Sequence, residues 1–206
     1  MNSAAWLVSA LMVALLTGRA TADPLLFAPT GTTLMTGQIR AEAAFGPDDP
    51  DASYYWLSAG FQQFELSAVR AAYGSGADEN IVGLQWSFLP ETTLTPAVSF
   101  GVRDVASQST EGIGIYGTIT RHLPIGASSR LLKDLSVTAG IGIGGVRGPF
   151  AGVEVKLPWR LFVQAEYDSR DLNGAFGWEP LDRIRLKAYN IRREFFLGAE
   201  LAPIRF

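Results

Sequence analysis

Residues 135–144 read LSVTAGIGIG, and apolar side chains alternate with small or polar ones along the whole stretch. Leu135, Val137, Ile141 and Ile143 take one face, and Ser, Thr and Gly take the other. A period of two places successive side chains on opposite faces of a β-strand. The stretch therefore predicts a strand with one apolar face and one small, polar face.

The same period recurs in residues 94–103, 112–120 and 161–168, and no stretch of comparable length has a convincing helical period. Turn formers such as Gln62-Gln63 separate the runs at short intervals, as in successive β-hairpins. The runs predict about twelve strands, near residues 34–45, 54–61, 64–73, 80–89, 94–105, 112–121, 135–147, 149–157, 160–168, 174–179, 183–190 and 194–203. We therefore expect an all-β fold, a closed antiparallel barrel.

Composition limits the chemistry that the chain can carry. Its 206 residues suit one ordinary domain. The chain has no cysteine, which excludes disulfides, thiolate metal sites, a cysteine nucleophile and an acylated lipoprotein cysteine. One histidine excludes a multi-histidine metal site, and a net charge of −3 offers no basic surface for nucleic acid. We expect a non-enzymatic protein without a metal or cofactor.

The first 22 residues have the pattern of a secretory signal peptide. An apolar run over residues 6–16 is followed by Ala20-Thr21-Ala22, which supplies small residues at a cleavage site. The run is short for a membrane-spanning helix. We expect cleavage after Ala22, export through the bacterial inner membrane, and one domain, the barrel, over residues 23–206.

Alternation alone does not say whether the apolar face points into the barrel or out of it. The other face is rich in Gly, Ser and Thr, and the whole chain has only three lysines, Lys133, Lys156 and Lys187. Small residues suit a narrow lumen, whereas a surface in water usually carries more long charged side chains. We therefore expect an outer-membrane barrel whose apolar face contacts lipid. The alternative is a soluble periplasmic β-barrel that binds a ligand.

Aromatic residues near strand ends favour the membrane interpretation, because such residues form girdles at the two interfaces of outer-membrane barrels. The chain also ends in Phe206 after an alternating strand, a type of ending that the barrel-assembly machinery reads in bacterial outer-membrane proteins. The candidates for lipid-interface aromatics are Tyr55, Phe61, Trp86, Phe88, Trp159 and Phe206.

With the apolar face outward, charged residues of both signs would line the lumen. Isolated charges away from bulk water are costly, so they need partners. The favoured interpretation is a salt-bridge network that plugs the barrel, and the alternative is a polar conduit for a substrate such as a polysaccharide. The candidates are Arg40, Glu42, Glu65, Arg103, Glu154, Lys156, Glu166, Arg185, Lys187 and Glu200.

Other motifs carry less weight. Two stretches match G-x-G-x-x-G, starting at Gly112 and Gly140, but their glycines alternate with Ile inside predicted strands and no helix follows. Outer-membrane lipases and deacylases resemble one another in a Ser two residues after a catalytic His, and here that position is Pro124, after His122. The acidic residues 48–51 have the composition of a solvated turn.

Four phrases resemble the YjbH-like exopolysaccharide-biosynthesis outer-membrane proteins. Residues 94–104 (LTPAVSFGVRD) resemble the strand phrase P-A-L-A-x-G-x-R-D of that family, and residues 26–40 (LFAPTGTTLMTGQIR) resemble the phrase that opens its barrel. Residues 60–70 (GFQQFELSAVR) and 163–168 (VQAEYD) are similar to two of its shorter phrases. The chain would be a single short barrel module of this family.

The resemblance implies an outer-membrane location and a part in exopolysaccharide biosynthesis or export, or in cell-envelope assembly, with no catalytic residue. The expected partners are outer-membrane lipid and lipopolysaccharide, the barrel-assembly machinery, and exopolysaccharide or its export proteins. Two alternatives stay open. The protein could be a porin-like or purely structural barrel, or it could be an outer-membrane enzyme that modifies lipids.

Overall fold

A computed structural model describes residues 25–49, 51–73, 78–125 and 131–205. Almost all of its regular structure is β-strand, as the period-two pattern predicts. The strands are β1 (Gln38–Phe45), β2 (Ser53–Phe61), β3 (Phe64–Ala72), β4 (Glu79–Leu89), β5 (Ala97–Arg103), β6 (Gly114–Pro124), β7 (Asp134–Gly144), β8 (Gly148–Lys156), β9 (Leu161–Tyr167), β10 (Leu172–Leu181), β11 (Ile184–Ile191) and β12 (Glu194–Arg205).

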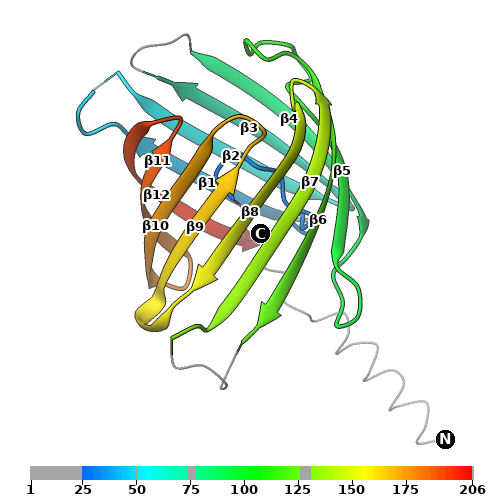
Figure 1. Cartoon of the computed structure of the whole chain (residues 1–206), viewed down its shortest axis with the longest axis vertical. Coiled ribbons are helices and arrows are strands. Elements are labelled where there is room, and N and C mark those ends of the chain that lie inside the picture. The colour runs from blue at the N-terminus through cyan, green and yellow to red at the C-terminus, as the bar shows by residue number, and fades with distance from the viewer. Residues whose placement is uncertain (1–24, 50, 74–77, 126–130, 206) are drawn as a thin grey trace, which may run out of the picture.

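The twelve strands close into one antiparallel barrel, which confirms the predicted fold class and strand number (Figure 1). Each strand pairs with its neighbours in sequence, and β1 pairs with β12 to close the ring. In that last ladder Ala43 lies opposite Ala199, and Phe45 lies opposite Leu197. Closure pairs the edges that an open sheet would leave exposed.

Several predicted boundaries were wrong in detail. Residues 34–37 were assigned to the first strand, but β1 begins at Gln38 and the preceding segment lies inside the barrel. The strand expected over residues 174–179 is longer: β10 begins at Leu172, includes Asn173 and ends at Leu181, and the turn before it covers residues 168–171. The turn between the last two strands is Arg192-Arg193, inside the gap that the expected ranges 183–190 and 194–203 leave. Asn is tolerated in strands where its side chain has a hydrogen-bond partner, which composition alone does not reveal.

The outer wall of the barrel is apolar. Large hydrophobic side chains are exposed on the outward faces of the strands, for example Leu66 at 55%, Ile141 at 64% and Phe176 at 52%. The inward positions of the same strands hold buried polar groups such as Thr118 and Glu154. This arrangement reverses the usual distribution of a protein in water, where apolar side chains fill the core.

One short helical element occurs in the described ranges, the 3-10 turn Pro158–Arg160 between β8 and β9. Trp159 in this turn is 85% exposed. No helix among the described residues is both long enough and apolar enough to cross a membrane.

The barrel has two mouths, which are named here by the chain segments that border them. The terminal mouth is bordered by Gln38, where β1 begins, and by Arg205, where β12 ends. The distal mouth is bordered by the loop of residues 104–113 between β5 and β6 and by the turn Arg192-Arg193 between β11 and β12. In the closed strand order this loop and this turn lie on opposite sides of the ring.

Candidate functional site

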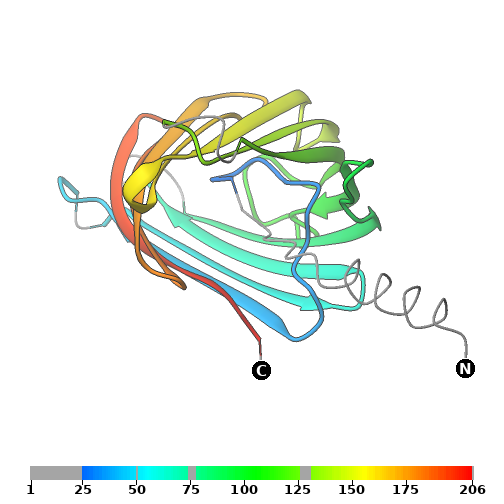
Figure 2. The same ribbon diagram turned by 90° about the horizontal axis from the view of Figure 1, so that it is seen from below.

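The lumen is occupied by the protein's own N-terminal segment. Residues 25–36, called the plug here, run through the interior before the chain enters β1, and Figure 2 shows this blue segment within the ring of strands. Leu25, Leu26, Phe27 and Ala28 are each at most 4% exposed. The plug contacts the wall mainly through its own backbone groups, and the wall offers side chains to meet them.

Glu166 on β9 holds the deep end of the plug. Its Oε2 accepts hydrogen bonds from the backbone N–H groups of Leu26 and Ala28, at 2.9 and 3.0 Å, and its Oε1 accepts from Phe27 N at 2.8 Å. Asn173 Nδ2 donates a fourth hydrogen bond to Oε1 at 3.0 Å. Within the described part of the chain Glu166 makes no ion pair, so these four donors offset the cost of burying its carboxyl group.

Five other strands bind the rest of the plug in the same manner. Thr120 Oγ1 accepts from Gly31 N at 2.6 Å, and Ser99 Oγ donates to Gly31 O at 2.5 Å. Glu65 Oε2 accepts from Leu34 N at 2.9 Å, close to the terminal mouth. Further contacts are Gln85 Nε2 to Thr30 O at 2.7 Å, Thr118 Oγ1 to Pro29 O at 3.1 Å and Tyr54 OH to Leu26 O at 3.2 Å. Buried backbone groups of an irregular segment need such partners, and here the wall supplies them.

Aromatic and small residues fix where the plug lies. Two guanidinium groups contact the Phe27 ring: the Cζ atoms of Arg103 and Arg192 lie 5.2 and 5.4 Å from its centroid. These cation–π contacts come from opposite sides of the distal mouth. Leu25 packs over Gly152 on β8, where a Cβ atom would overlap the Leu25 side chain. A larger residue at position 152 would displace the plug.

A buried ion network fills the lumen beside the plug. Lys187 Nζ lies 2.6 Å from Glu200 Oε2 and 3.1 Å from Glu42 Oε1, and Tyr189 OH also donates to Glu42. Arg185 Nη2 lies 2.7 Å from Glu154 Oε2. Each charge in this group is compensated by a neighbour of opposite sign, which is the condition for burying it.

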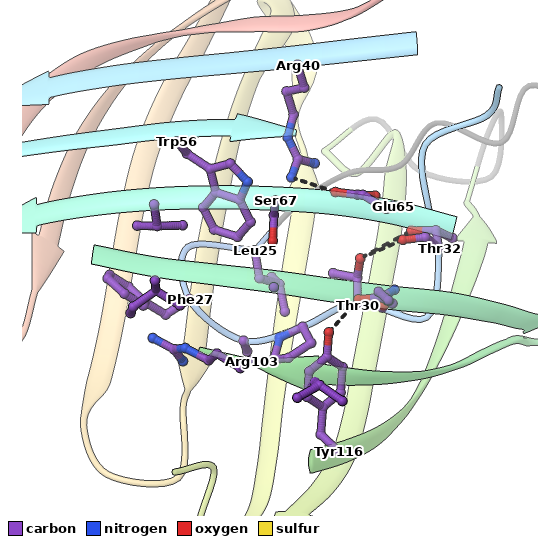
Figure 3. A pocket seen from close by; sticks show the side chains of 17 residues that line it. Leu25, Phe27, Thr30, Thr32, Arg40, Trp56, Glu65, Ser67, Arg103 and Tyr116 are labelled. Atoms are coloured by element: carbon purple, nitrogen blue, oxygen red, sulfur yellow. Dashed lines mark hydrogen bonds and ion pairs between the residues drawn. The ribbon is translucent and has the colours of Figure 1, made fainter. Parts of the chain in front are cut away.

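A small polar cavity remains between the plug and the wall formed by β1 to β6. Its volume is about 60 Å³, which leaves room for only a few water molecules at roughly 15 Å³ each. Figure 3 shows Arg40 with its ion pair to Glu65, at 3.5 Å between Nη2 and Oε1, and Trp56 on one side, with Arg103 and Tyr116 on the other. With the plug in place, the cavity is far too small to hold a sugar chain.

The distal mouth is crossed by a second set of ion pairs. Arg192 Nη2 lies 2.8 Å from Glu111 Oε1, and Arg192 Nη1 lies 3.2 Å from Glu79 Oε2. Arg170 Nη1 reaches the same Glu111 oxygen at 2.7 Å. Arg192 has a φ of 50°, a left-handed conformation that costs a non-glycine residue about 1–2 kcal/mol. The ion pairs keep the residue in this strained position.

Asp104 organises the loop that supplies Glu111. Its carboxylate accepts hydrogen bonds from Ser109 Oγ at 2.6 Å, Ser109 N at 2.8 Å and Gln108 N at 2.9 Å. Burial by itself would raise the pKa of Asp104, but these hydrogen bonds and the nearby Arg103 hold it below its ordinary value. The loop therefore keeps a charged carboxylate at neutral pH.

The structure places the predicted luminal residues as follows. Most are buried on inward positions, while Arg103 and Lys156 are half-buried. The ion network joins Glu42, Glu154, Lys156, Arg185, Lys187 and Glu200. Arg40 and Glu65 form a separate pair, and Glu166 and Arg103 contact the plug.

Five of the predicted interface aromatics are exposed on the outside: Tyr55, Phe61, Trp86, Phe88 and Trp159. Phe206 lies outside the described residues, as does the predicted signal peptide. Tyr54 and Trp56, neighbours of Tyr55, turn inward instead: Tyr54 binds the plug, and Trp56 donates from Nε1 to Ser58 Oγ at 2.6 Å. A strand that alternates cannot present three consecutive aromatics to the same side.

Sequence reasoning missed the plug and the role of Arg192. Residues 25–36 have no period-two alternation, and Pro29 and Gly31 interrupt them. The absence of alternation in this apolar stretch was the one sequence signal that it is not a strand of the wall. His122 lies near the end of β6, where Nδ1 is 2.5 Å from Glu91 Oε2. Among the described residues no cluster of three or more His, Cys, Asp or Glu side chains could hold a metal ion.

Comparison of the chain with protein-family models returns no match, and no curated protein matches it either. The function must therefore be argued from the geometry of the plugged barrel and from the short sequence stretches described above.

Proposed function

We propose that the protein is a non-enzymatic β-barrel of the bacterial outer membrane, closed by its own N-terminal segment, and that it serves exopolysaccharide export or cell-envelope assembly. The observation that carries the membrane location is the exposed apolar outer wall. Side chains such as Leu57, Ile143 and Leu197, at 55%, 68% and 49% exposure, would face water in a soluble protein. In a bilayer they would contact hydrocarbon, and the closed barrel leaves no unpaired strand edge there.

The plugged lumen favours a role other than free diffusion of solutes. The plug is held by hydrogen bonds from six strands, and the cavity between it and β1 to β6 is about 60 Å³. A general porin needs a continuous aqueous path, and a segment bound inside the lumen argues against one. The proposed protein is therefore a closed module that acts through its surfaces or opens only when the plug leaves.

The polysaccharide role rests on the resemblance of residues 94–104 and three further phrases to the YjbH-like proteins. In this barrel the Arg and Asp of that phrase are Arg103, which contacts the plug, and Asp104, which holds the distal loop. The family phrase thus coincides with the residues that close the distal mouth. This coincidence supports a polysaccharide role that depends on the residues of the distal mouth.

Membrane fractionation tests the location. The full chain, expressed with its signal peptide, should stay with membranes after carbonate extraction and should run faster on a gel when unheated than when boiled. Resistance of a closed barrel to detergent produces such a shift. Recovery in the aqueous fraction would support the soluble periplasmic alternative and would overturn the membrane proposal.

Deletion of the gene tests the process. Secreted exopolysaccharide should change in amount or chain length, and the intact gene should restore it. Unchanged polysaccharide across growth conditions would overturn the polysaccharide role while leaving the membrane location standing. Mass spectrometry of lipid A after overexpression addresses the enzyme alternative, and we expect no change.

A further inference from the structure

The outer wall carries a hollow among its apolar side chains. A groove of about 760 Å³ crosses the outside of β11, β12 and β1 to β4. Two adjacent rows of hydrogen-bonded neighbours line it. The first row runs Ile184, Leu201, Ala41, Leu57, Ala68 and Val82 across the six strands.

Small side chains form the floor of the groove. Ala199 and Ala43 face each other in the second row, next to Ala41 and Ala68 of the first. The groove gathers these four alanines, whereas exposed alanines elsewhere, such as Ala139, lie among large side chains such as Ile141 and Ile143. Because the hollow lies where large side chains are missing, a slender apolar chain could enter it and contact the wall directly.

One end of the groove is polar and carries the Arg70–Asp78 ion pair. The second row continues from Ala43 through Tyr55 to Arg70 and Asn80, close to the distal mouth. The Arg70 side chain is 60% exposed, and its ion pair with Asp78, at 3.2 Å, uses one of its five N–H donors. The groove is therefore amphipathic, with an apolar trough and an anion-binding group at its rim.

The first strand begins and the last strand ends at the terminal mouth, which is the periplasmic side in bacterial outer-membrane barrels, so in the proposed location the distal mouth faces outward. Lipid A, whose sugar carries phosphate, is the lipid of the outer leaflet. We propose that the groove binds one acyl chain of lipid A and that Arg70 binds its phosphate. This proposal rests on the proposed membrane location.

Charge complementarity is what selects this occupant. A phosphate fits the exposed donors of Arg70, because guanidinium binds phosphate in a bidentate manner, and Asn80 beside it adds an amide donor. Strands in closed barrels tilt by about 35–45°, so a groove that follows the hydrogen-bonded rows also rises along the barrel axis. An acyl chain lying in it would therefore descend from the headgroup at the rim into the bilayer.

Native mass spectrometry of the full mature chain in detergent tests the proposal, with added lipid A, monophosphoryl lipid A or phosphatidylglycerol. We expect a one-to-one lipid A adduct, with less binding of the other two lipids. Arg70→Gln should weaken lipid A binding about tenfold, since a hydrogen bond to a charged group contributes roughly 1.5–3 kcal/mol. Ala43→Trp should abolish the adduct by filling the groove.

Matched controls lie on the opposite wall. Ala139→Trp adds the same bulk on the exposed face of β7, and Arg147→Gln removes an exposed arginine at the distal mouth; both should bind lipid A as the wild type does. Equal binding by all variants, or equal retention of phosphatidylglycerol, would overturn the proposal. A dimer that Ala43→Trp dissociates would also overturn it, by making the groove an interface between two copies.

Failure of the lipid A proposal can be distinguished from failure of the proposed membrane location. Each variant is checked for membrane association and for the gel shift on heating. A chain that passes both checks but shows no lipid A adduct contradicts the groove assignment alone. A chain that fails both contradicts the proposed function itself.

Discussion

Arg192 binds Glu111 across the distal mouth, with 2.8 Å between Nη2 and Oε1, although the two residues lie on opposite sides of the strand ring. Glu79 shares the same guanidinium group, and the Phe27 ring lies beneath it. One side chain in a strained two-residue turn thus connects the turn, the distal loop and the plug. The distal closure should therefore depend on this contact.

Replacing Arg192 and Arg193 separately by glycine distinguishes the contact from the turn. Both residues have positive φ, at 50° and 70°, so either glycine relieves backbone strain. Arg192→Gly also removes the ion pairs of Glu79 and Glu111, and we expect it to lower the free energy of unfolding by about 1–3 kcal/mol. Arg193→Gly, at an exposed position, should raise it by up to about 1 kcal/mol. The gel shift on heating, followed against temperature or urea, measures the stability of each variant. Equal stability of the two variants would show that the contact between Arg192 and Glu111 contributes nothing.

Glu166→Gln should loosen the plug without unfolding the barrel. The carboxylate accepts three plug N–H groups and one from Asn173 through two oxygens, and an amide has only one acceptor oxygen. Hydrogen exchange at the amides of residues 26–28 should become about tenfold faster or more.

The control for this change is Glu42→Gln. Glu42 is also a buried luminal carboxylate, but its hydrogen bonds go to Lys187 and Tyr189. It should lower the stability of the whole barrel and leave the relative protection of residues 26–28 unchanged. If both variants exchange alike at those amides, Glu166 has no special part in holding the plug.

Removing the plug should open the lumen. A mature chain that lacks residues 25–33 loses most of the segment that occupies the interior, including the plug backbone groups that Glu166, Thr120 and Ser99 bind. In planar bilayers we expect stable single-channel steps from this variant and none from the wild type. Its gel shift on heating verifies that the barrel still forms. Wild-type steps of the same size would instead support the porin-like alternative.

Acid should weaken the distal loop through Asp104. The pKa of Asp104 lies below its ordinary value in the folded protein, so its stabilising effect is complete above about pH 4, the usual range of an unfolded carboxyl group. It is lost as pH falls through the lower, folded value. Asp104→Asn should therefore be less stable than the wild type at pH 7, and the difference should shrink below pH 4. Asp48→Asn, at an exposed loop position, is the control for the loss of one acidic group and is measured over the same pH range.

The fold could be predicted from the sequence because period two is a local property. Residues 135–144 reveal both faces of β7 without knowledge of any neighbour, and Glu154, Glu166 and Lys187 fall on inward positions for the same reason. The plug could not be predicted, since residues 25–36 have no period and take their shape from side chains on six strands. Gly31, for example, is fixed by Ser99 and Thr120, which lie 68 and 89 residues away.

The sequence by itself determined an alternating chain that closes into an antiparallel barrel, with apolar side chains on one face and charges on the other. Only the tertiary structure decided which charges meet, as when Arg192 reaches Glu111 and Lys187 joins Glu42 to Glu200. The reason is that a strand's faces follow from its own residues. Contacts through the lumen depend instead on the stagger of all twelve strands at once, and on what fills the space that they enclose.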